Sequence, residues 1–213
     1  MSEYINQLKR QRNRCLGCQE YLTGNPFPSQ DVATKRLRGF LCQSCNMVLR
    51  LVKENGCTLY RLAAHLTLDR TKTLIYVIGS LKNENIPKVG DRLREIGLDA
   101  LENWWSSGPE ADMCWQMYEK NRGHSFKEAL ASRESQNVFR FDRAYLDLCD
   151  AAVLVLPAGR SGHLELSYVI GRDKPGFILM DGEPKQYDQM YNFATDIFFS
   201  VDEMVSKLKI LYA

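Results

Sequence analysis

The stretch LCDAAVLVLPAGRSGHLELSY, residues 148–168, decides the fold of this chain. Its uncharged run of Ala, Val and Leu is typical of a strand that is buried on both faces of a parallel sheet. The run ends in a loop of Pro, Gly and Ser, after which helical spacing resumes. In open α/β sheets the ligand crevice lies beyond the carboxyl ends of the strands, where helix N-termini offer free backbone N–H groups. The stretch therefore predicts a ligand site, with Glu165 in the first turn of the helix.

Strand and helix patterns alternate on both sides of this stretch. Buried runs predict strands at residues 74–81, 148–156, 174–180 and 197–199, and amphipathic spacing predicts helices at 87–96, 124–147 with a break, 164–172 and 201–208. Such alternation implies a parallel sheet with right-handed crossovers and helices on both faces. The predicted fold class is therefore α/β.

Charge divides the chain into two parts. Residues 1–72 carry 12 Lys and Arg against 5 Asp and Glu, a formal charge of +7, whereas residues 73–213 carry 16 against 21, a charge of −5. We expect an N-terminal module over residues 1–68, a polar linker over 69–73 and a larger domain over 74–213. The basic module either contacts a polyanion such as nucleic acid or simply presents a solvated basic face.

Four of the seven cysteines form two C-x-x-C pairs, Cys15 with Cys18 and Cys42 with Cys45. In an intracellular chain this spacing indicates a metal site rather than disulfides. Four thiolates suit tetrahedral zinc, and a module of about 70 residues with few large apolar side chains gains folding energy from such an ion. We predict one structural zinc ion and no organic cofactor.

No apolar run reaches the roughly 20 residues that span a bilayer. The first residues, Met1–Tyr4, lack the apolar region of a signal peptide. We therefore expect a cytoplasmic protein that has no membrane partner.

The segment RGFLCQSCN, residues 38–46, with the cysteine knuckle before it and two helical patterns after it, resembles the endonuclease VII branch of the His-Me finger nucleases. The resemblance covers roughly residues 14–66 and implies a small treble-clef-like module. Where that family has its catalytic Asp-His pair, this chain has Ser29-Gln30-Asp31-Val32, and no histidine precedes His65. The histidine is the general base, since a neutral imidazole accepts a proton near neutral pH. We therefore expect a module without nuclease activity.

The sequence leaves two alternative roles open for this module. Lys35, Arg36 and Arg38 are positioned to contact nucleic-acid phosphates. The other role is dimerisation or scaffolding.

Five short pieces of the larger domain resemble, in order, the nucleoside 2-deoxyribosyltransferase family, which includes deoxynucleoside monophosphate N-glycosidases. They are Tyr76–Gly79, Phe141–Asp142, Cys149–Ala151, Ser161–Leu166 and Gly171–Pro175. The resemblance implies a flavodoxin-like fold and cleavage of N-glycosidic bonds, or base exchange, on 2′-deoxynucleosides or nucleotides. It also implies a small-molecule nucleoside or nucleotide partner and a homo-oligomer, a dimer or higher.

By this resemblance Glu165 matches the nucleophile that attacks C1′ of the deoxyribose. A carboxylate beneath C1′ stabilises an oxocarbenium-like centre and can trap it covalently. Asp142 matches the upstream aspartate and is the candidate for helping the leaving base accept a proton. Tyr76 ends the first strand, where the family keeps a group that orients the nucleophile.

The remaining candidates would bind substrate. Gly79 and Ser80 leave room for a sugar or phosphate beside the backbone. The family's aspartate six residues before the nucleophile is Gly159 here, and the following Arg160 and Ser161 suit a phosphate, which favours a 5′-nucleotide unless Arg160 points to solvent. Further candidates are Gly162 and His163 in the pocket, Trp104 as a stacking surface or as core, and Met190, Tyr191 and Asn192 acting across a subunit interface.

Two other functions fit the same sequence. One is a nucleotide-binding or nucleotide-sequestering protein that keeps the pocket without turnover. The other is a DNA-associated glycosidase that the zinc module delivers to polynucleotide, for which salt-dependent DNA binding is the requirement.

Overall fold

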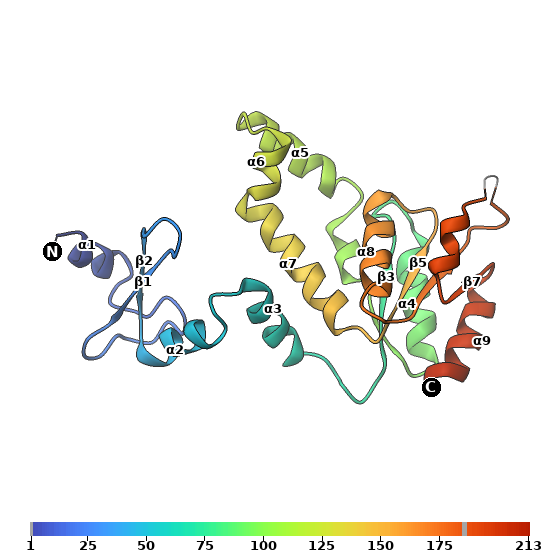
Figure 1. Cartoon of the computed structure of the whole chain (residues 1–213), viewed down its shortest axis with the longest axis horizontal. Coiled ribbons are helices and arrows are strands. Elements are labelled where there is room, and N and C mark those ends of the chain that lie inside the picture. Colours follow the sequence, from blue (N-terminus) through green and yellow to red (C-terminus); the bar gives the residue numbers. More distant parts are fainter. Residues whose placement is uncertain (1, 185–186) are drawn as a thin grey trace. The chain divides into compact units, whose positions relative to one another are not determined.

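A computed structural model describes residues 2–184 and 187–213, so Met1 and residues 185–186 lie outside the described structure. The chain divides into two compact units, Met1–Leu59 and Tyr60–Ala213. Figure 1 shows the elements of each unit in chain order. The division falls within helix α3 (Gly56–His65), earlier in the chain than the expected module end at residue 68. The linker at residues 69–73 stays a prediction.

The second unit is built on a five-stranded parallel sheet with the strand order β4-β3-β5-β6-β7. Numbered within the unit, this is the order 2-1-3-4-5 of flavodoxin-like folds, which confirms the predicted fold class. The strand order reverses between β3 and β5, so their carboxyl ends form the expected ligand crevice. The strands are β3 (Leu74–Ile78), β4 (Asp99–Leu101), β5 (Ala151–Val155), β6 (Gly176–Leu179) and β7 (Asp196–Phe198).

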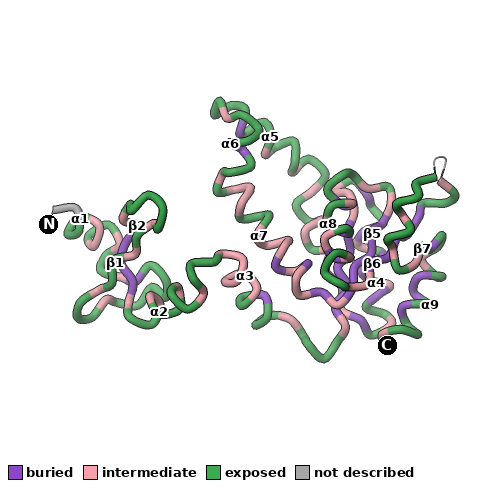
Figure 2. Tube along the Cα trace, viewed as in Figure 1, coloured by how far each residue is buried: buried purple, intermediate pink, exposed green. Residues whose placement is uncertain are grey.

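Helices cover both faces of this sheet. Strands β3, β5 and β6 are buried along their whole length, as Figure 2 shows for the centre of the second unit, because apolar side chains meet them on either side. Helices α4 (Asn85–Glu95) and α9 (Val201–Tyr212) close one apolar core. Helices α7 (Arg133–Leu148) and α8 (Arg160–Ile170) close the other, so side chains that face α7 and α8 share one face of the sheet.

Shorter helices precede α7. The predicted break within residues 124–147 falls at Ser132, which caps α7 by accepting a hydrogen bond from the Ser135 backbone N–H. Ser125 and Glu128 form a capping box at the start of α6. The remaining elements of this unit are η1 (Asn103–Ser107), α5 (Ala111–Asn121), α6 (Phe126–Ala131) and η2 (Gln189–Phe193).

Helix α8 begins earlier than the sequence predicted. It starts at Arg160 rather than Leu164, because extended backbone ends at Gly159 and the following residues are already helical. The prediction that Glu165 lies in the first turn is therefore wrong, since Arg160, Ser161 and His163 occupy that turn and Glu165 follows in the second. The favourable interaction of a carboxylate with the helix dipole falls off within the first turn, so Glu165 gains little from it.

The first unit has the predicted treble-clef-like arrangement. The Cys15–Cys18 knuckle precedes an antiparallel hairpin of β1 (Phe27–Gln30) and β2 (Leu37–Leu41), and Cys42 and Cys45 stand at the start of the following helix. Among the residues of this unit whose burial the structure describes, from Tyr4 to Leu59, few apolar side chains are buried, and Cys15, Phe40 and Leu41 are among them. The helices of this unit are α1 (Ser2–Arg10), α2 (Gln43–Leu51) and the first turn of α3.

Within the described part of the chain, every helix is too short or too polar to cross a membrane.

Candidate active site and metal centre

Three predicted catalytic residues meet on the α7/α8 face of the sheet. Tyr76 is fully buried in β3, and its hydroxyl donates to Oδ1 of Asp142 on α7 at 3.5 Å. Glu165 of α8 lies close enough to both that its charge acts on the Tyr76 hydroxyl and the Asp142 charge acts on Glu165. The fold therefore brings two carboxyls and one phenol together from three elements that are far apart in the sequence.

Both carboxyls of this pair have raised pKa values. Burial raises the pKa of Glu165 from 4.5 to about 7, and repulsion from the Asp142 carboxylate adds to the shift. Burial raises the pKa of Asp142 from 3.8 to about 6, against the hydrogen bond from Tyr76, which lowers it. Between these two values the pair holds one proton, which lies mostly on Glu165 because its pKa is the higher of the two. A pair that works as acid and nucleophile needs the proton on one carboxyl and an ionised partner beside it.

Because the folded protein raises this pKa, ionised Glu165 costs stability. The stability that the protonated Glu165 side chain contributes is fully present below pH 4.5, the pKa of an unperturbed glutamate. It is lost as the pH rises through about 7, the pKa in the folded protein. Glu165→Gln is therefore expected to raise the free energy of unfolding at pH 8 by about 1 to 3 kcal/mol, and to change it little near pH 4.5. Urea unfolding at the two pH values checks this. A variant less stable than the parent at pH 8 would contradict the raised pKa.

The loop after β3 lies at the point where the strand order reverses. A cavity of about 180 Å³ lies there, and its lining residues are Ser80, Lys82, Asn83, Pro157 and Ala158. Gly79 has a packing role beside its proposed ligand role, since a Cβ would lie 2.2 Å from Cδ1 of Ile86. Ser80 accepts the Lys82 backbone N–H at 3.2 Å.

Asn83 in this loop is not among the site residues predicted from the sequence. Its side chain is buried, donates to the Val155 carbonyl at 3.5 Å and accepts the Asn85 backbone N–H at 3.0 Å. It thus ties the β3–α4 loop to the end of β5. The available signal was a short polar segment, NEN at residues 83–85, between a buried strand and an amphipathic helix.

The first turn of α8 faces this crevice with both small and charged residues. A Cβ at Gly162 would contact Leu154 at 3.0 Å and Ile78 at 3.2 Å, so this glycine lets the helix approach the ends of β3 and β5. A Cβ at Gly159 would meet open space. Arg160 and Ser161 are exposed. The structure thus leaves the Arg160 guanidinium accessible both to solvent and to an incoming anion.

His163 and Tyr191 contact each other within one chain. His163 Nε2 lies 3.0 Å from the Tyr191 hydroxyl, His163 Nδ1 lies 2.9 Å from the Gly159 carbonyl oxygen, and the two rings stack with centroids 5.9 Å apart. The exposed Asn192 donates instead to the Gln189 carbonyl in its own turn, and Met190 is exposed. Action of these residues across a subunit interface stays a prediction.

Trp104 anchors the end of β3. Its Nε1 donates to the Val77 carbonyl at 3.0 Å, and its ring packs against both apolar cores. It lies in η1 rather than in an irregular loop. The structure therefore gives Trp104 the core role of the two alternatives, and stacking on a base stays a prediction.

A larger cavity of about 260 Å³ lies on the α4/α9 side, at the carboxyl ends of β5 and β6. Lys88, Asp181 and Ser200 are among the residues that line it, and none of the sequence-predicted site residues does. Neither cavity is lined by Glu165 or Asp142. The carboxyl pair is the stronger candidate site, because two neighbouring ionisable groups with raised pKa values indicate chemistry more directly than cavity volume does.

The four predicted cysteine ligands form a cluster in the first unit, with their Sγ atoms all within 4.8 Å of one another. Four sulfurs around one metal at about 2.3 Å would lie roughly 3.8 Å apart in a tetrahedron. Sγ of Cys18 and Sγ of Cys42 are 3.8 Å apart. A Cβ at Gly17 would approach the Cys45 sulfur at 2.7 Å, so a side chain there would crowd the cluster. The donor set and its spacing fit one tetrahedral metal ion.

Backbone groups support the buried thiol of this cluster. The Cys42 and Gly17 N–H groups donate to Cys15 Sγ at 3.2 and 3.3 Å. Although burial raises it, these and the Cys18 backbone lower the pKa of Cys15 to about 6. Such N–H···S bonds favour the thiolate, which is the form that binds metals.

The segment that replaces the nuclease Asp-His pair has structural contacts of its own. Asp31 Oδ1 accepts the backbone N–H groups of Ala33 and Thr34, and its Oδ2 pairs with Arg38 at 2.8 Å. Arg38 also pairs with Glu54 at 2.9 Å. Two carboxylates thus offset the charge of Arg38, which weakens it as a phosphate contact, and nucleic-acid binding by this unit stays a prediction.

No protein-family model matches the chain, and no curated protein matches its sequence. Among solved structures, the chain is similar to a Clostridium botulinum CMP N-glycosidase, BcmB, with 12% sequence identity and a TM-score of 0.40. That alignment covers 64% of this chain and 98% of the glycosidase chain. The geometry of the carboxyl pair, rather than this likeness, supports the function proposed for the chain.

Proposed function

We propose that the second unit cleaves the N-glycosidic bond of a 2′-deoxynucleoside or its 5′-monophosphate, with Glu165 as the nucleophile. The observation that carries this proposal is the meeting of Glu165, Asp142 and Tyr76 on one face of the sheet, with both carboxyl pKa values raised. The resemblance of their sequence contexts to the nucleoside 2-deoxyribosyltransferase family supports the same roles.

The proposed reaction starts from the less populated one-proton form of the pair, in which Asp142 carries the proton and Glu165 is ionised. A Glu165 oxygen attacks C1′ as the bond from C1′ to the base nitrogen breaks. The departing base takes the proton that Asp142 holds, which leaves a neutral base, an ionised Asp142 and a sugar ester on Glu165. Water then attacks C1′ and gives a proton to the ionised Asp142 while the ester bond from C1′ to Glu165 breaks, which releases the sugar. When a second base attacks C1′ in the same way, the reaction is an exchange. Tyr76 donates a hydrogen bond to Asp142 and so orients that carboxyl.

The shared proton predicts a bell-shaped pH profile. Below about pH 6 both carboxyls become protonated and the nucleophile is lost, whereas above about pH 7 both ionise and the acid is lost. We expect kcat/KM for base release to peak between these values. In Asp142→Asn the acid is absent and the repulsion on Glu165 is gone. We therefore expect kcat/KM to be lower than in the parent, and its increase with pH to begin at a lower pH. A parent profile that is flat from pH 5 to 9 would disprove this pairing.

The start of α8 favours a phosphorylated substrate. The backbone N–H groups of a helix N-terminus attract anions, and the exposed Arg160 and Ser161 add a cation and a hydroxyl. We propose that these residues bind the 5′-phosphate. Arg160→Ala should then raise KM for the monophosphates and leave the unphosphorylated deoxynucleosides unaffected.

The test is direct incubation of the protein with the four deoxynucleosides and their 5′-monophosphates, each with and without a second free base. Chromatography of free bases separates hydrolysis, which needs no acceptor, from exchange, which does. Release or exchange with any substrate supports the proposal, and none with all eight contradicts it.

For the first unit we propose one structural Zn²⁺ held by Cys15, Cys18, Cys42 and Cys45. The four sulfurs and their near-tetrahedral spacing support zinc, which thiolate sites of this kind favour. The ion would supply folding energy rather than chemistry, because four protein ligands leave no open position for a substrate.

A further inference from the structure

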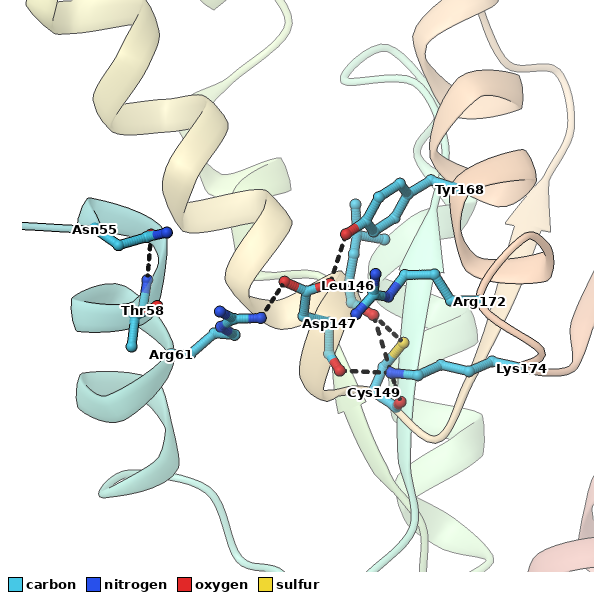
Figure 3. Close-up of polar contacts among 9 residues, drawn as sticks. All are labelled: Asn55, Thr58, Arg61, Leu146, Asp147, Cys149, Tyr168, Arg172 and Lys174. Atoms are coloured by element: carbon cyan, nitrogen blue, oxygen red, sulfur yellow. Dashed lines mark hydrogen bonds and ion pairs between the residues drawn. The ribbon is translucent and has the colours of Figure 1, made fainter. Parts of the chain in front are cut away.

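Asp147, in the last turn of α7, is a buried carboxylate outside the proposed catalytic pair. Its side chain is only 3% exposed, and both of its oxygens have partners. Oδ1 accepts the Tyr168 hydroxyl at 2.6 Å and lies 3.3 Å from Arg172 Nε, while Oδ2 lies 3.0 Å from an Arg61 guanidinium nitrogen. Figure 3 shows these side chains converging on Asp147 from α3, from α8 and from the segment after α8.

The contact between Asp147 and Tyr168 lies close to the catalytic pair along both helices. Tyr168 follows Glu165 by three residues on α8, slightly less than one turn. Asp147 follows Asp142 by five residues on α7, which is roughly 7.5 Å along the axis. Because each helix segment is stiff over this length, a change in the contact between Asp147 and Tyr168 displaces one carboxyl of the pair relative to the other.

A second group fixes the same end of α7. Lys174 Nζ donates to the backbone carbonyls of Leu146, Asp147 and Cys149, the last two at 2.6 and 2.7 Å (Figure 3). A cation that donates to the last carbonyls of a helix also complements its dipole. The Arg172 guanidinium lies 5.5 Å from the centroid of the Tyr168 ring. The end of α7 is therefore held by directional polar contacts, which fix its position along α8 more tightly than apolar packing alone.

We propose that Asp147 and Tyr168 are positioning residues that lock α7 to α8 and thereby set the separation of Asp142 and Glu165. Arg61 of α3, in the part of that helix that belongs to the second unit, completes the lock by pairing with the second oxygen of Asp147. The consequence for turnover rests on the proposed function, whereas the geometric consequence for the carboxyl pair does not.

The sharpest test is Tyr168→Phe, which removes one hydroxyl and keeps the ring in the core. A displacement of about 1 Å at a reacting group can cost up to about 10²-fold in rate, so we expect this variant to lower kcat about 10-fold with KM within about 2-fold of the parent. Asp147→Ala should lower kcat by about 10²-fold, and Asp147→Asn, which can still accept the Tyr168 hydroxyl, should recover part of the loss. The matched control is Asp202→Asn, which removes the Arg92–Asp202 ion pair between α4 and α9 on the other face of the sheet.

A second measurement does not depend on turnover. Titration of the Glu165 side-chain carboxyl by ¹³C NMR should show its pKa falling in Tyr168→Phe, because a looser pair repels less. If the parent releases no base from any nucleotide, the proposed function fails. This titration alone then tests whether Asp147 and Tyr168 set the separation of Asp142 and Glu165. A folded Tyr168→Phe protein, with parental circular dichroism, whose Glu165 pKa equals that of the parent would overturn the inference. If the parent is active, a Tyr168→Phe variant with the parental kcat would also overturn the inference.

Discussion

Replacement of Glu165 with glutamine should lower kcat for base release by about 10³-fold or more, since loss of a nucleophile removes the covalent route entirely. The amide keeps the size of the side chain but cannot attack C1′ or carry the negative charge that stabilises the sugar cation. Because Glu165→Gln is also expected to be the more stable protein at pH 8, loss of activity and loss of fold can be separated in this single variant.

The covalent step has its own signature. Rapid quenching of the parent with a 2′-deoxynucleotide should give a peptide that contains Glu165 and carries the mass of the sugar, and the glutamine variant should lack it. Glu95→Gln is the matched control, because Glu95 is an exposed glutamate on α4, far in the fold from the pair. Normal base release by Glu165→Gln would remove Glu165 from the mechanism.

Removal of the metal from the four-cysteine cluster is expected to unfold the first unit. Structural zinc in small modules contributes on the order of 10–16 kcal/mol of apparent binding free energy near neutral pH. The buried apolar residues of this unit are too few to replace it. A strong chelator, or Cys45→Ser, should therefore abolish hydrogen-exchange protection over residues 1–59, while the sheet of the second unit keeps its own protection.

Metal analysis and a matched variant make this result decisive. The parent should contain one zinc ion per chain and Cys45→Ser none. Cys57→Ser alters a cysteine that is not part of the cluster, and it should keep both the metal and the protection. Protection that persists after complete removal of the metal would show that residues 1–59 fold through their apolar contacts alone.

Strands β3, β5, β6 and β7 were predictable from their apolar runs, and β4 was not. Strands β3, β5 and β6 stand out because they are buried on both faces and therefore read as unbroken apolar runs. Strand β4 has three residues, Asp99–Leu101, and gives no such run. It forms because β3 offers it a free edge in register, with Leu74 opposite Asp99. Pairing with a distant strand, rather than local composition, creates this element.

The start of α8 shows a similar limit. Periodicity finds a helix from its apolar positions, and those begin at Leu164. The turn before it, which begins at Arg160, is polar and small because it packs through Gly162 against the ends of β3 and β5. This turn forms where the backbone of the helix packs closely against the strand ends, and no pattern of apolar side chains in the sequence predicts it.

Residue identity and local spacing alone determined the α/β class and the four clustered cysteines, and the resemblance of short sequence pieces to a known family selected Glu165, Asp142 and Tyr76 as candidates. Only the tertiary structure decided that these three lie together, that His163 contacts Tyr191, that Trp104 anchors β3 and that Asp147 joins α7 to α8. The physical reason is the sequence separation of the contacts involved. Periodicity reports contacts within a turn of helix or between neighbouring residues of a strand, whereas a site depends on how helices pack across a sheet.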